Sequence, residues 1–179
     1  MKTSFRVIAG SAALLALVAV GNAQANPPQS LQTEGTGTVT VTSGSSVRIV
    51  NDANEYGAAY TKSNLIKYEK NKPSTRLIGQ VDYSFSSSGS VAGGAPRFSI
   101  PIDINDDGSV DGYAFLDVNG CNSTTVSTES STCTVFFNSE VFSNWDAFVA
   151  AHPTYTVASV PFIIADQPGD YFIYDIDVK

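Results

Sequence analysis

The chain has 179 residues, with 17 Asp and Glu, 10 Lys and Arg, and a net charge of −7 at pH 7. This length suits one ordinary domain with a sizeable hydrophobic core. The acidic balance argues against nucleic acid as a partner, because binding phosphates requires a basic surface. The single histidine, His152, excludes the common zinc sites, which need two or three histidines.

The first residues have the pattern of a secretory signal. Lys2 and Arg6 flank a positive start, residues 7–20 form an apolar run of 14 residues, and small residues precede Ala25. As a helix, this run would rise about 21 Å, which is short of the ~30 Å hydrocarbon core of a membrane. We therefore expect a signal peptide over residues 1–25, export to the extracellular space, the periplasm or the cell surface, and no membrane span after cleavage.

The remaining chain divides into a leader and one domain. Residues 26–35 contain several turn formers and few apolar side chains, which predicts a flexible leader before a single domain over residues 36–179. At the start of this domain, alternating β-branched residues predict strands over residues 38–42 and 46–50.

Residues 51–75 show no regular period and contain bases and tyrosines. One interpretation is a plain connection with a short strand near residue 65. The other is a binding segment, because long loops on rigid β-frameworks often carry function. In that case Tyr56, Tyr60 and Tyr68 are the candidate exposed aromatic residues.

Two later segments show the period-two alternation of half-buried strands. The first has Leu77, Gly79, Val81, Tyr83 and Phe85 on one face, and the second has Phe98, Ile100, Ile102 and Ile104. Because proline lacks an amide hydrogen, Pro101 favours an edge position or a bulge for the second strand.

The last third of the chain predicts more strands and one helix. Strands are expected over residues 113–118, 134–137, 155–158 and 162–165, followed by one in which Phe172, Tyr174, Ile176 and Val178 alternate. Residues 143–152 predict a short helix that Ser143 caps. Short strands without a βαβ rhythm predict an all-β antiparallel β-sandwich of jelly-roll or immunoglobulin-like kind, with a barrel as the alternative.

Between the strands around residues 98–104 and 113–118, the sequence DINDDGSVD concentrates oxygen donors. Calcium binds about six to eight oxygens, and alternate residues of a tight loop converge on one point. The sequence therefore predicts a Ca²⁺ site whose ligands are Asp103, Asn105, Asp107, the Ser109 carbonyl and Asp111. An acidic hairpin turn without a metal is the alternative.

This loop, with Gly108 at the sharp turn, resembles the DxDxDGxxD calcium loops of integrin-type propeller repeats. It resembles the loops of dockerins and thrombospondin type 3 repeats more loosely. The resemblance covers only these nine residues, so it implies a metal site and neither a fold nor an activity. An EF-hand is disfavoured, because Ala114 stands where the bidentate Glu would be needed.

Cys121 and Cys133 are the only two cysteines, and in an exported protein they predict one disulfide. Eight of the eleven residues between them are Ser or Thr, which predicts a surface loop that does not contribute to the core. Asn122 begins an Asn-Ser-Thr sequence, so it is a glycosylation acceptor if the source is eukaryotic.

The function that the sequence favours is a secreted calcium-binding module that recognises carbohydrate or another surface ligand without catalysis. A structural protein of the cell surface or matrix is the alternative. A small carboxylate-dependent glycan hydrolase ranks third, with Asp175 and Asp177 as the acid pair on the last strand. A Ser-His-Asp hydrolase would depend on His152, and the chain has no Gly-x-Ser-x-Gly motif.

Overall fold

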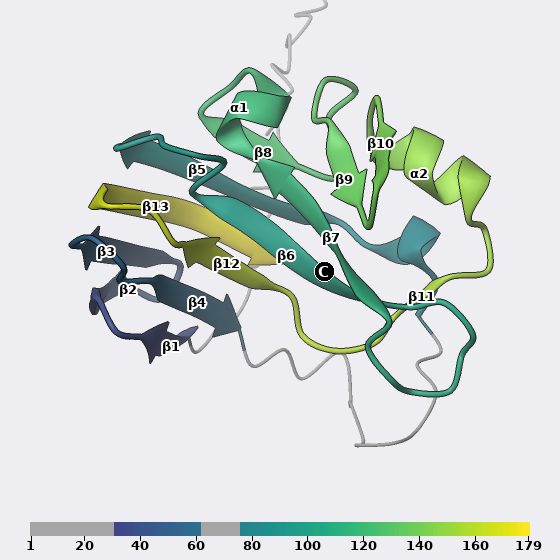
Figure 1. The fold of residues 1–179 in the computed structure, drawn as a ribbon, viewed down its shortest axis with the longest axis horizontal. Helices are drawn as coiled ribbons and strands as arrows, with labels where there is room; N and C mark the ends of the chain where they lie inside the picture. Colours follow the sequence, from purple (N-terminus) through teal and green to yellow (C-terminus); the bar gives the residue numbers. More distant parts are fainter. Residues whose placement is uncertain (1–30, 62–75) are drawn as a thin grey trace, which may run out of the picture.

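The protein is a sandwich of two antiparallel β-sheets, as the computed structural model of residues 31–61 and 76–179 shows (Figure 1). This confirms the predicted all-β antiparallel fold. Within those two ranges, no helix is long and apolar enough to cross a membrane.

Sheet A lies in front in Figure 1 and sheet B behind it. In spatial order, sheet A contains β1 (Leu31–Gly35), β4 (Gly57–Thr61), β12 (Phe162–Ala165), β6 (Arg97–Asp103), β7 (Gly112–Asp117), β9 (Val135–Phe137) and β10 (Glu140–Phe142), with β11 (Thr156–Val157) also paired to β6. Sheet B contains β2 (Thr38–Ser43), β3 (Ser46–Asn51), β13 (Gly169–Val178), β5 (Tyr83–Gly89) and β8 (Thr125–Ser127). The helical segments are η1 (Ile78–Gln80), α1 (Val118–Cys121) and α2 (Trp145–Ala151).

The core lies between the two sheets, and β6 contributes its centre. Phe98, Ile100 and Ile102 alternate along this strand and are fully buried, as the sequence predicts. The ring of Phe98 packs against Phe85 and Tyr83 of β5, with centroids 4.9 and 6.1 Å apart. These contacts join the middle of sheet A to the middle of sheet B.

β6 is a central strand, so the predicted edge position of Pro101 is wrong. β7 pairs along one side of β6, whereas on the other side the pairing with β12 ends at Ser99 and that with β11 begins at Ile102. The Pro101 carbonyl accepts a hydrogen bond from the Ala158 amide, so the proline nitrogen points to this second side as well. Pro101 therefore lies in the gap between β12 and β11, where no amide donor is required.

Other strands also differ from the prediction. Gly57–Thr61 falls in the stretch of residues 51–75 that shows no regular period but forms β4, and the strand expected near residue 65 lies outside the described residues. Leu31–Gly35 falls within the predicted leader but forms edge strand β1 by pairing with β4, which composition alone does not reveal. The strand predicted from residue 77 begins only at Tyr83, because η1 buries Ile78 and leaves Leu77 exposed.

A β-bulge in β13 overturns the predicted alternation of the last strand. The register between β13 and β5 shifts between Tyr174 and Asp177. Phe172 and Tyr174 therefore lie on the outer face of sheet B, although simple alternation places them with the buried Ile176 and Val178. The prediction is wrong because one inserted residue resets the period of two.

The predicted helix is present as α2, but its cap differs. Asn144 is the N-cap, and its side-chain oxygen accepts a hydrogen bond from the Ala147 amide at 2.8 Å, so the prediction of Ser143 as the cap is wrong. Trp145 and Phe148 of this helix are buried. Both asparagine and serine are good caps, so sequence alone does not choose between neighbouring candidates.

We predict that Phe98→Ala lowers the free energy of unfolding by about 3 to 5 kcal/mol, because it leaves a cavity between the sheets. Phe172→Ala removes an exposed ring from the outer face of sheet B and should cost no more than about 1 kcal/mol. Urea denaturation of both variants measures the difference. Equal losses would contradict the central position of Phe98.

Candidate functional site

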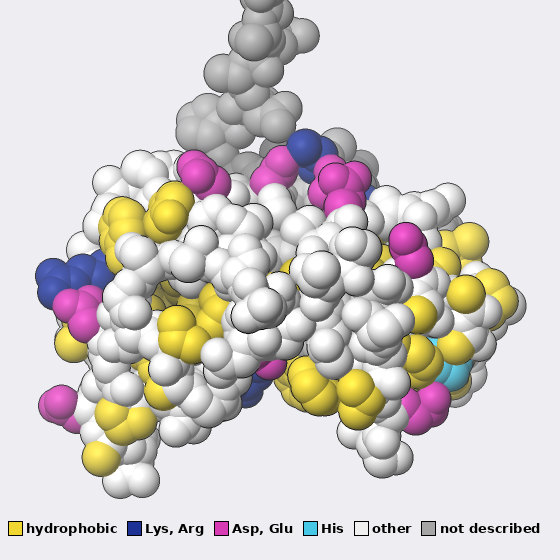
Figure 2. Space-filling view, turned by 90° about the horizontal axis from the view of Figure 1, so that it is seen from above, with side chains coloured by type: hydrophobic (Ala, Val, Ile, Leu, Met, Phe, Trp, Pro, Cys, Tyr) yellow, Lys and Arg dark blue, Asp and Glu magenta, His cyan; other side chains and the backbone are white. Residues whose placement is uncertain are grey.

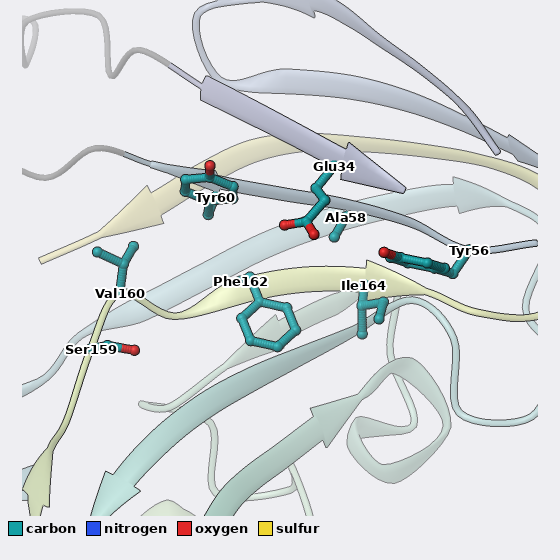
Figure 3. A pocket seen from close by; sticks show the side chains of 8 residues that line it. All are labelled: Glu34, Tyr56, Ala58, Tyr60, Ser159, Val160, Phe162 and Ile164. Carbon is teal, nitrogen blue, oxygen red and sulfur yellow. The ribbon is translucent and has the colours of Figure 1, made fainter. Parts of the chain in front are cut away.

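A groove with a volume of about 490 Å³ crosses the outer surface of sheet A where β1, β4 and β12 lie side by side (Figure 3). Its lining is largely apolar and comes from three strands and the loops that flank them. The lining residues are Glu34, Tyr56, Ala58, Tyr60, Ser159, Val160, Phe162 and Ile164.

Strand register explains why these side chains share one surface. In the β4–β12 pair, Tyr60 is directly opposite Phe162, and Ala58 is directly opposite Ile164. Glu34 of β1 is in turn opposite Ala58. Directly opposite residues of antiparallel strands project to the same face. The small side chain of Ala58 leaves the floor of the groove low between its larger neighbours.

The groove combines apolar walls with a few polar atoms. Figure 3 shows the Glu34 carboxylate pointing into it from β1, with Tyr60 and Tyr56 towards its two ends and Phe162 on the other wall. Ligand pockets commonly have this composition, in which apolar surface supplies contact area and a few polar groups fix orientation. The arrangement suits a flat ligand that has an apolar face and hydroxyl groups at its rim.

The sequence anticipates part of this groove. Tyr56 and Tyr60, named as candidate exposed aromatic residues, both line it, and Tyr68 lies outside the described residues. Glu34 and Phe162 were not anticipated, because they come from strands far apart in the sequence. Only the pairing of β4 with both β1 and β12 brings them together.

The predicted calcium loop, residues 103–111, connects β6 to β7 as an antiparallel hairpin, as the sequence predicts. Asp103 is fully buried at its start. Its Oδ1 accepts hydrogen bonds from the amides of Asn105, Asp106 and Asp107 at 3.1, 2.6 and 3.3 Å, and its Oδ2 accepts one from Gly108 at 2.7 Å. Hydrogen bonds to the charged form stabilise a carboxylate, so these amides offset the cost of burying this one.

The other acidic residues of the loop lie on its exposed turn. The Asp107 carboxylate accepts a hydrogen bond from the Ser109 amide at 2.8 Å, which holds the pKa of Asp107 below its ordinary value. Asp111 accepts one from the Ile104 amide, also at 2.8 Å. Each of these bonds uses one oxygen of its carboxylate. In residues 31–61 and 76–179, no three His, Cys, Asp or Glu side chains are gathered so that they could hold a metal ion together.

Cys121 and Cys133 form the predicted disulfide. The segment between them, however, does contribute to the core, so that part of the prediction is wrong. It contains β8, in which Val126 is fully buried opposite Phe85 of β5. A single apolar side chain among many Ser and Thr is sufficient, because it occupies the one position of β8 that faces inward.

The residues considered for catalysis do not line the groove. His152 follows α2, and its ring stacks on Tyr155 with centroids 4.3 Å apart. Asp175 lies at the bulge of β13 with φ 52°, and Asp177 is ion-paired with Lys179. The proposed acid pair is therefore on sheet B, whereas the groove is on sheet A.

Comparisons of the chain with protein-family models, with curated proteins and with solved structures found no match.

We predict that Asp103→Ala destabilises the protein by at least about 2 kcal/mol, because the amides that now bond to its carboxylate lose their acceptor. Asp103→Asn should cost less, because its amide oxygen can still accept the bonds made to Oδ1. Asp106→Asn is the matched control, since it removes the same charge at an exposed position with φ 58°, which asparagine tolerates. Thermal melts in chelator separate this effect from metal binding, and equal costs at Asp103 and Asp106 would contradict it.

Proposed function

We propose that this protein is an exported, non-catalytic recognition module that binds carbohydrate in the groove of sheet A. The observation that carries the proposal is the direct pairing of Tyr60 with Phe162, with the Glu34 carboxylate beside the two rings. Sugar rings present apolar C–H faces that pack on aromatic rings, and their hydroxyl groups donate hydrogen bonds to carboxylates. Both kinds of partner occur in this groove.

The shape of the groove favours a sugar over a small organic cation. A cage for quaternary ammonium surrounds the charge with ring faces. Here the two tyrosines stand towards opposite ends of an elongated groove, and Phe162 lies on the other wall (Figure 3). Side chains spaced in this way can support a sugar ring that lies along the groove, but they do not surround a cation.

We also propose that the loop of residues 103–111 binds Ca²⁺ through Asp103, Asn105, Asp107, Ser109 and Asp111. Two features support this: Asp107 and Asp111 are exposed on the turn, where their carboxylates are accessible to an ion, and the hairpin holds all five residues in one nine-residue loop. Affinity near the ~10⁻⁴ to 10⁻³ M of extracellular modules is expected. The ion would stiffen the hairpin of β6 and β7 beside the groove.

Export is part of the proposal because disulfides persist in oxidising compartments. The bond between Cys121 and Cys133 fits the expected signal peptide over residues 1–25. An extracellular setting would also supply millimolar calcium and glycan ligands.

We predict that Tyr60→Ala weakens sugar binding about tenfold or more, which corresponds to ~1.4 kcal/mol or more. Calorimetric titration with oligosaccharides that bind on a glycan array measures this. Phe172→Ala, which removes an exposed ring from the outer face of sheet B, should bind like the parent. Binding of choline but of no sugar, or equal binding by both variants, would overturn the proposal.

We predict that millimolar Ca²⁺ raises the melting midpoint of the parent by a few degrees relative to chelator, because an ion that binds only the folded state stabilises it by mass action. Asp107→Ala should lose this response, and Asp106→Asn, which removes a neighbouring charge, should keep it. If the parent melts identically in both conditions, the loop is an acidic hairpin turn held by its own hydrogen bonds, and the calcium proposal fails.

A further inference from the structure

The aromatic residues of the groove belong to a longer row that crosses sheet A in register. Tyr60 is opposite Phe162, Phe162 is opposite Ser99 of β6, Ser99 is opposite Phe115 of β7, and Phe115 is opposite Phe136 of β9. Neighbouring strands are ~4.8 Å apart, so the row from β4 to β9 spans roughly 19 Å. It is far longer than a single sugar ring.

Tyr113 of β7 is opposite Pro101, and its ring connects the two aromatic rings on either side of Ser99. Its ring meets Phe162 edge-on, with centroids 5.8 Å apart, and stacks with Phe115 at 6.3 Å and an interplanar angle of 18°. Tyr113 and Phe136 are each 38% exposed. Both side chains are therefore partly accessible to a ligand, and the neighbouring rings hold Tyr113 in place.

The far end of the row has a second hollow, of about 310 Å³. Phe115 and Phe136 form its apolar part, and Arg97, Asp117 and Asp166 supply its polar groups. It thus repeats the composition of the groove, with aromatic surface beside carboxylates.

Arg97 is held rigidly in this hollow. It donates two hydrogen bonds to Asp166, at 2.8 and 2.7 Å, and its guanidinium lies over the Phe115 ring, 5.3 Å from the centroid. The hydrogen bonds from Arg97 hold the pKa of Asp166 below its ordinary value. The pair is therefore ionised, oriented and mutually neutralised, which suits hydrogen bonding to a neutral ligand.

The charge of the two hollows argues against an anionic ligand. Among the residues that the structure places around them, Glu34, Asp117 and Asp166 are acidic and Arg97 is the one basic residue. The whole chain also carries a net charge of −7. An anionic polysaccharide would be repelled, whereas an uncharged one would not.

The shape of this side argues against a second copy of the chain as the occupant. In Figure 2, the side of sheet A forms the lower edge, which is indented between two lobes with hydrophobic side chains on both. A two-fold axis through the middle of this face would set indentation against indentation and leave the centre of the interface unpacked. A narrow, extended ligand does fit such an indentation.

We propose that the hollow formed by Phe115, Phe136 and the Arg97–Asp166 pair is a second sugar subsite, so that one neutral, linear glycan chain lies across β4, β12, β6, β7 and β9. This inference rests on the proposed function of the groove. It adds the ligand class: the interior of an uncharged polysaccharide chain that contacts both subsites at once.

The test is a calorimetric titration of the full chain with β-1,4-linked glucose, xylose and mannose oligosaccharides, from disaccharide to hexasaccharide. Affinity for the matching series should rise with length. Phe136→Ala should weaken hexasaccharide binding about tenfold or more and leave disaccharide binding unchanged. Phe136→Leu keeps apolar volume and the fold but removes the flat ring, so it should show the same selective loss, while Phe172→Ala should bind like the parent.

Each contrary result has a distinct meaning. If Tyr60→Ala weakens binding and both Phe136 variants bind the hexasaccharide normally, the groove stands and the second subsite is wrong. If none of these neutral series binds, the proposed ligand class is wrong, and if no glycan of the array binds either, the proposed function of the groove fails as well. A stronger response to polygalacturonate than to neutral chains overturns the ligand class, and a Phe136-dependent dimer in sedimentation velocity assigns the face to self-association instead.

Discussion

The pleat of β6 is the constraint on which both the core and the outer face of sheet A depend. Because side chains alternate at every residue, burial of Phe98 and Ile100 between the sheets fixes Ser99 on the outer face. A shift by one residue would exchange these faces and expose the core, so the register is strongly specified. β6 is paired on both sides, and this register therefore also determines that Phe162 and Phe115 stand opposite Ser99. The hydrophobic core thus sets the spacing of the aromatic row.

The position of Asp103 at the end of β6 likewise determines the conformation of the acidic loop. Asp103 is buried, and its oxygens accept the amides of the turn that follows, so the folded strand fixes the turn. The crowding of carboxylates is tolerable because Asp103 is satisfied by backbone dipoles while Asp106 and Asp107 are exposed to water. A turn organised in this way is present before any ion binds. Calcium would then add stability by mass action and would not be needed to form the hairpin.

Sequence periodicity predicts the sandwich well because its strongest signals, such as that of β6, arise from burial. Periodicity fails where backbone pairing, and not burial, determines whether a strand forms or which way its side chains face. The strand β1 has little apolar character, Pro101 is accommodated by a gap between two partners, and the bulge in β13 resets an otherwise regular alternation. The candidate site likewise has one part that local sequence predicts and one part that depends on strand pairing. Composition singles out Tyr56 and Tyr60, but their alignment with Phe162 depends on long-range register, which no local pattern encodes.

The side chains along the proposed glycan path differ in rigidity. This difference bears on which of them would contribute affinity and which would discriminate between sugars. Towards β7, the rings of Tyr113 and Phe115 constrain each other, and Asp166 fixes the guanidinium of Arg97, so few rotamers remain to be ordered by a ligand. Towards β1, Glu34 is exposed on an edge strand, so it can adjust to different hydroxyl geometries at a cost in side-chain entropy. The central rings are therefore suited to supplying most of the affinity, and the groove at β1 to discriminating between sugars.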